Sequence, residues 1–147
     1  MRVLSFMGML AAGTLLTWTP VRAHHAFAAE FDANKPIHFD SATVTKVELI
    51  NPHSWIHVDV QTADGKMENW AIEAGSPNIL MRRGITRNTL KKGDKIVIDG
   101  YQAKDGSKRA NGRDLKLPNG QQLFLGSSGG EGAPYEVQRP GVDVQKK

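Results

Sequence analysis

The chain has 147 residues, of which 19 are basic and 15 acidic, and it contains no cysteine. A length of this order predicts a single domain. The formal net charge of +4 falls to +2 if Arg2 and Arg22 are removed with an export signal, and so small an excess does not indicate a nucleic-acid partner. Without cysteine, the fold cannot depend on disulfide bonds, and no thiolate can serve as a nucleophile or metal ligand.

The first 23 residues have the parts of a secretory signal peptide. Arg2 gives the positively charged start, residues 3–18 are uncharged and mostly apolar, and Val21 and Ala23 occupy the −3 and −1 positions of a signal-peptidase site. We therefore expect cleavage after Ala23, in preference to an uncleaved membrane anchor. No later stretch is apolar enough to span a bilayer, so no transmembrane segment is expected in the mature protein.

The mature chain begins with an arm and a long strand. Residues 24–36 show no clean period, and we interpret them as an arm that docks through its two phenylalanines. A strand is expected at Ile37–Ile50, whose alternation changes phase between Val44 and Val47, as it does at a bulge or a strong bend. The residues after 125 are rich in glycine, proline, serine and charge, which is typical of a disordered tail.

A β-hairpin is predicted after the Asn51-Pro52 turn. Residues 54–62 and 67–74 each alternate between apolar and polar side chains, as strands buried on one face do. Because opposed residues share a face, a loop of odd length keeps Trp70 in the core, and Ala63-Asp64-Gly65 supplies one with glycine in the left-handed position. The resulting register sets Val58 opposite Trp70 and Ile56 opposite Ile72 on the buried face, and Trp55 opposite Glu73, His57 opposite Ala71 and Asp59 opposite Asn69 on the second face.

The remaining elements indicate a small barrel. Ser76-Pro77 is typical of a helix start and Gly84 of its end, and further strands are expected at Lys95–Ala103, Arg113–Leu117 and Gln121–Leu125. Five or six short strands and one helix after the third strand predict a mainly β fold. We expect a small antiparallel β-barrel similar to the oligonucleotide/oligosaccharide-binding (OB) fold, with a two-sheet β-sandwich as the alternative. The expected parts of the chain are a signal peptide at 1–23, an arm at 24–36, a barrel domain at 37–125 and a disordered tail at 126–147.

Five segments together resemble a family of small exported bacterial proteins classed only as a domain of unknown function. They are HHAFAAEFD, NPHSWIHVDV, NWAIEAGSPNILMRRG, LKKGDKIVIDGYQAKDGS and LFLGSSGG. The resemblance covers about residues 24–130, and it implies a periplasmic, single-domain protein. It carries no assigned activity, substrate or catalytic residue, so any function must be inferred from the residues themselves.

The predicted mature N-terminus is a candidate metal site. Cleavage at the expected position gives His24 a free α-amine beside its imidazole, and these two nitrogens can chelate one ion, as in copper histidine-brace sites. Nitrogen ligands suit copper(II), which leads the order of divalent-metal affinities. His25 follows directly, and His53 or His57 would complete the site from the domain, with His38 a weaker option. In the alternative interpretation, the terminal histidines bind metal only incidentally.

The second face of the hairpin is a candidate ligand site. An aromatic platform with donors and acceptors nearby suits a sugar, a peptide or another small ligand. Its residues are Trp55, His57, Asp59, Asn69 and Glu73. A general acid/base pair of Asp59 and Glu73 is a weaker hypothesis, because no nucleophile or oxyanion motif accompanies it. Alternatively, Trp55 is covered by the arm or the helix, and the polar residues are simply solvated.

A basic run surrounds the predicted helix. It consists of Arg82, Arg83, Arg87, Lys91, Lys92 and Lys95. Such a run suits anionic lipid headgroups or an acidic partner, and it is equally typical of a solvated helix whose lysines keep the adjacent strand from pairing with other chains.

These features favour an exported periplasmic binding or interaction module over an enzyme. Copper is the first expected ligand, held by His24 with help from His25 and His53 or His57. The alternative is a metal-free module that docks a small ligand or an envelope protein on the face of Trp55 and His57.

Overall fold

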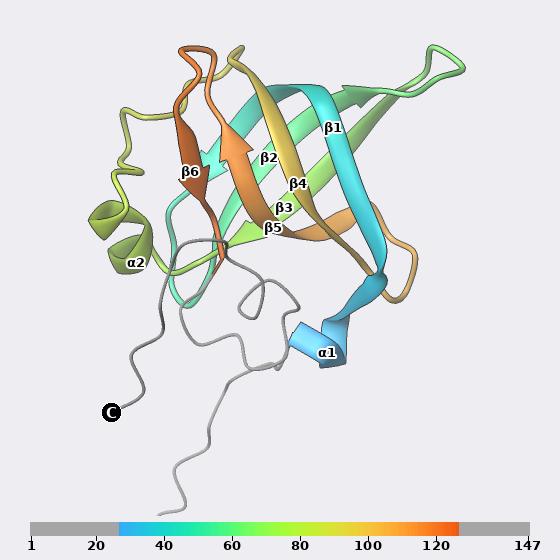
Figure 1. Cartoon of the computed structure of the whole chain (residues 1–147), viewed down its shortest axis with the longest axis horizontal. Coiled ribbons are helices and arrows are strands. Elements are labelled where there is room, and N and C mark those ends of the chain that lie inside the picture. The colour runs from blue at the N-terminus through green and yellow to red at the C-terminus, as the bar shows by residue number, and fades with distance from the viewer. Residues whose placement is uncertain (1–26, 127–147) are drawn as a thin grey trace, which may run out of the picture.

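The computed structural model describes residues 27–126, which form a β-barrel with two short helices (Figure 1). The elements are α1 (Phe27–Glu30), β1 (Phe31–Glu48), β2 (Ser54–Gln61), β3 (Met67–Ala74), α2 (Pro77–Arg82), β4 (Lys95–Ala103), β5 (Arg109–Lys116) and β6 (Gln122–Phe124). All six strands belong to one sheet, in the order β3-β2-β1-β4-β5-β6. The predicted signal peptide, and all of the predicted tail except Gly126, lie outside the described residues.

A pairing between β3 and β5 closes the sheet into a barrel. Residues 71–73 of β3 lie parallel to residues 109–111 of β5, whereas the other pairs of neighbouring strands are antiparallel. We call this contact the seam. The ring therefore runs β1-β2-β3-β5-β4, with α2 between β3 and β4. This arrangement confirms the predicted OB-like barrel.

The β2–β3 hairpin has the register that the alternation predicted, with Val58 opposite Trp70. The backbone N–H of Thr62 donates to the carbonyl of Lys66 at 2.8 Å, so three residues form the tip as expected. Among them Gly65 has a φ of 82°, a left-handed conformation that glycine adopts without steric cost. Side-chain alternation and the parity of the loop were sufficient to define this pairing.

Strand β1 is longer than predicted and pairs with strands on both sides. It begins at Phe31, ahead of the predicted start, because Phe31 pairs with Ala103 of β4 and packs with Phe27 in a small second cluster of buried side chains. Part of the predicted arm therefore belongs to the sheet. The register with β2 shifts between Val44 and Lys46, where the change of phase indicated a bulge.

The later elements lie where they were predicted, but the start of β5 differs by several residues and β6 is one residue shorter at each end. Strand β4 has the predicted bounds, but β5 begins at Arg109 rather than Arg113, because its first residues pair with β3 across the seam. Helix α2 begins after Ser76 as expected, and Gly84 beyond its end has a φ of 85°. Within the described part of the chain, neither helix is long and apolar enough to cross a membrane.

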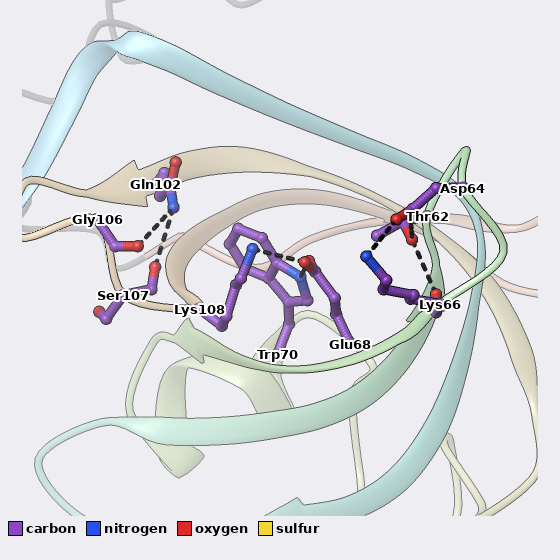
Figure 2. A network of polar contacts seen from close by, with 9 residues as sticks. All are labelled: Thr62, Asp64, Lys66, Glu68, Trp70, Gln102, Gly106, Ser107 and Lys108. Carbon is purple, nitrogen blue, oxygen red and sulfur yellow. Dashed lines mark hydrogen bonds and ion pairs between the residues drawn. The ribbon is translucent and has the colours of Figure 1, made fainter.

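The barrel interior holds the main apolar core, and Trp70 packs where the barrel closes. Its indole is 5% exposed and packs edge-on against Phe39, with ring centroids 5.0 Å apart. Indole Nε1 donates to Glu68 Oε2 at 3.0 Å, and Lys108 Nζ lies 2.7 Å from Glu68 Oε1, as Figure 2 shows. Lys108 directly precedes β5, so this ion pair joins β3 to β5 beside the seam.

Candidate functional site

A cluster of charged and aromatic side chains lies on the outer side of the barrel at the seam. We call it the seam cluster, and its members are Glu30, His53, Trp55, Glu73 and Arg109. Trp55 and Glu73 are opposed on β2 and β3, and both lie on the face away from the apolar interior. Arg109 of β5 places one guanidinium nitrogen 3.0 Å from Glu30 Oε2, and its central carbon lies 5.9 Å from the centroid of the Trp55 ring system. The cluster therefore connects α1, β2, β3 and β5.

Glu73 is the buried member of the seam cluster, with 7% of its surface exposed. Burial raises the pKa of the Glu73 carboxyl from 4.5 to about 7; the charge of Glu30 adds to the rise, and Arg109 opposes it. A carboxyl group with such a pKa gains or loses its proton near neutral pH. Buried groups with shifted pKa values are a common mark of functional sites.

His53 directly precedes β2 and holds the Glu73 carboxyl. Its Nδ1 lies 2.8 Å from Glu73 Oε1, and its side chain is less than one third exposed. At this distance the two groups form an ion pair when the imidazole is protonated and the carboxyl is ionised. A cationic His53 would lower the pKa of Glu73 and oppose the effect of burial. Contact with a carboxylate also fixes the orientation of the ring.

His57 belongs to a different group of side chains. Its Nε2 lies 2.8 Å from Glu48 Oε2, and Lys46 Nζ lies 2.6 Å from the other oxygen of the same carboxyl. The hydrogen bonds from Lys46 first, and from His57 second, lower the pKa of Glu48 below 4.5. The His57 imidazole is therefore held by β1 rather than by the seam cluster.

Asp59 and Asn69 also stand apart from the seam cluster. Asn69 Nδ2 donates to Asp59 Oδ1 at 2.9 Å across the β2–β3 pair. Asp59 is four positions along β2 from Trp55, which is opposite Glu73, and this corresponds to roughly 13 Å at the rise of a strand. Asp59 and Glu73 thus do not converge, and the structure does not support the weaker hypothesis of an acid/base pair.

The histidines at the predicted mature terminus, His24 and His25, lie outside the described residues. His38 is described, and it bridges two carboxylates: Nδ1 lies 2.6 Å from Asp99 Oδ1, and Nε2 lies 2.8 Å from Asp40 Oδ1. These contacts, with Asp99 the larger cause, raise the pKa of His38 above 6.5. Between residues 27 and 126, no group of three or more His, Asp or Glu side chains could hold a metal ion. The predicted copper site therefore stays a prediction.

Two members of the seam cluster, Glu30 and Arg109, were not predicted from the sequence. Arg109 reaches the cluster through the parallel pairing of β3 and β5, which leaves no local pattern. Glu30 is placed by α1, whose Phe27 ring packs on Phe31 and Tyr101 with centroids 5.8 and 5.4 Å apart. The one feature of the sequence that could have indicated Glu30 is its position between Phe27 and Phe31, the two phenylalanines expected to dock the arm.

The chain belongs to the Family of unknown function (DUF6152), whose model matches residues 14–112. This range includes every residue of the seam cluster. No curated protein and no solved structure matches the chain. The description of the family assigns no activity.

Proposed function

We propose that this member of the Family of unknown function (DUF6152) is an exported periplasmic binding module that holds a metal ion, copper(II) first, between the mature terminal His24 and His53. The observation that carries the proposal is the contact between His53 Nδ1 and the buried Glu73 carboxyl at 2.8 Å. Histidines that bind metals almost always have their second ring nitrogen bonded in this way, which fixes the ring and raises its basicity. With Nδ1 engaged by Glu73, Nε2 is the nitrogen that would coordinate the metal.

Chain connectivity also supports the involvement of His24. Only three steps along the chain separate His24 from Phe27, a reach of about 10 Å when extended. Phe27 begins the helix whose last residue, Glu30, pairs with Arg109 in the seam cluster. The α-amine and imidazole of His24, together with His53, supply three nitrogen ligands, which suit the tetragonal preference of copper(II). His25 is an additional ligand in this proposal, and His57 is less suited because Glu48 of β1 holds its ring apart from the seam cluster.

The experiment compares two matched histidine variants in protein that begins at an authentic His24. Copper(II) affinity is measured by competition with a chelator of known affinity, for the wild type, His53→Gln and His57→Gln. We expect His53→Gln to weaken binding at least tenfold, which corresponds to about 1.4 kcal/mol, and His57→Gln to leave it nearly unchanged. Equal affinity of His53→Gln and the wild type would remove His53 from the site and contradict the proposal.

A metal-free module is the second candidate, and Trp55 is the reason to keep it. Its indole is only partly buried, and it lies on the outer face beside the guanidinium of Arg109. A partly buried indole next to a cation suits a small ligand or an envelope protein. In this case periplasmic crosslinking of metal-free protein should capture a partner that Trp55→Ala loses and His24→Ala retains. Loss of the partner in both variants would instead favour the metal-dependent proposal.

A further inference from the structure

One side of the barrel carries a basic surface that the seam cluster does not use. Between residues 77 and 94 the chain has five basic residues and a single acidic one, Asp94. The segment consists of α2 and its connection to β4, which lie together on one side of the barrel in Figure 1. Four of its basic side chains are exposed. They are Arg82, Arg87, Lys91 and Lys92.

These four cations have no acidic partner among residues 27–126. Three lysines elsewhere in the barrel are paired, since Lys46, Lys66 and Lys108 each lie within 2.7 Å of a carboxylate oxygen. The single acid of the segment is engaged locally, since Asp94 Oδ2 accepts a hydrogen bond from the backbone N–H of Lys91 at 2.8 Å. The segment therefore presents a net positive charge that the described part of the barrel does not neutralise.

Exposed apolar side chains accompany the charge. Ile50 is 51% exposed and Met81 50%, and they are two of the three large hydrophobic side chains that residues 27–126 leave exposed. Met81 directly precedes Arg82 in α2. Ile50 lies in the turn between β1 and β2, and its neighbour Leu49 lines a cavity of about 210 Å³ together with Val47 and Arg87. The β1–β2 turn and the basic segment thus adjoin.

We propose that this surface, made of Ile50, Met81 and the four exposed cations, docks the protein on a membrane that contains anionic phospholipids. Lys and Arg near such a membrane are attracted to its negative surface potential, and apolar side chains among them can insert at the level of the headgroups. The surface shares no residue with the seam cluster, so the proposal is independent of metal binding.

The test is co-sedimentation of the mature protein with vesicles of phosphatidylcholine alone or with added phosphatidylglycerol. The variant replaces the four cations by glutamine: Arg82→Gln, Arg87→Gln, Lys91→Gln and Lys92→Gln. The matched control removes the same charge from exposed lysines elsewhere: Lys35→Gln, Lys66→Gln, Lys104→Gln and Lys116→Gln. We expect the wild type and the control to bind only the anionic vesicles, and the variant to bind them at least tenfold more weakly. A second variant, Ile50→Ser with Met81→Ser, should also weaken binding while retaining the salt dependence.

All substituted side chains are exposed, and thermal unfolding confirms that each variant is folded before binding is measured. If the control loses as much binding as the variant, net charge alone is responsible and the proposed surface is wrong. If the wild type binds neither kind of vesicle, the membrane proposal is overturned, and an acidic protein becomes the partner to seek.

Discussion

Replacing Glu73 by glutamine should remove a pH-dependent cost from the folded state. The carboxyl is 7% exposed, and its pKa rises from 4.5 to about 7, mainly through burial. Because the folded pKa lies above the unfolded one, the native state binds the proton more tightly, and this group makes stability fall as the pH rises from 4.5 to 7. The full shift corresponds to a loss of about 3 kcal/mol of folding stability above pH 7, and to no loss below pH 4.

The contact with His53 limits this cost. A cationic imidazole 2.8 Å from the carboxyl favours the ionised form of Glu73, so about 3 kcal/mol is an upper limit. We therefore expect the free energy of unfolding of Glu73→Gln, relative to that of the wild type, to rise by about 1 to 3 kcal/mol from pH 5 to pH 8.

Urea unfolding at pH 5 and pH 8 measures this change. The control is Glu68→Gln on the same strand, because contact with Lys108 first, and with the Trp70 indole second, lowers the pKa of Glu68 below 4.5. Both the folded and the ordinary pKa of Glu68 lie below pH 5, so its substitution should have the same effect at the two pH values. If Glu73→Gln likewise shifts the free energy of unfolding equally at pH 5 and pH 8, the buried carboxyl does not have a raised pKa and the reasoning is refuted.

Two further predictions concern the fold and the exposed histidine. Gly100→Ala should destabilise the protein by about 1 to 3 kcal/mol, because the added Cβ would lie 2.3 Å from the backbone oxygen of Asn111. A denaturant titration that shows no loss of stability would contradict the close approach of β4 and β5. The pKa of His38, measured in an NMR pH series, should lie above 6.5, because of the contact with Asp99 first and with Asp40 second. The substitution Asp99→Asn should lower this pKa. An unchanged pKa of His38 in that variant would refute the assigned cause.

Local patterns predicted the hairpin and the bounds of β3 and β4 correctly, whereas β1 and β5 begin several residues before their predicted starts. In β2 and β3 one face is buried and the other is not, so the alternation and the parity of the loop leave a single register in which Trp70 is inside. The parallel seam could not be predicted in this way. It joins residues 71–73 to residues 109–111, and such a pairing depends on the closure of the whole barrel rather than on any local period.

The candidate site was also predicted only in part from the sequence. Glu73 was predicted to lie on the outer face opposite Trp55, and it does. The sequence could not show that Glu73 is buried there, that His53 rather than His57 contacts it, or that Arg109 crosses the seam to reach Trp55. Burial and side-chain pairing depend on residues that are distant in the chain. The period of a strand, in contrast, can be recognised from successive residues.

The most direct test of the metal-binding proposal is a copper(II) titration of protein that begins at His24, beside a control with one alanine added ahead of it. The extra residue leaves every side chain in place but moves the free amine away from the His24 imidazole. The proposal predicts submicromolar binding that weakens at least a hundredfold in the control, a loss of about 2.7 kcal/mol. Equal and weak binding by both proteins would contradict the terminal copper site.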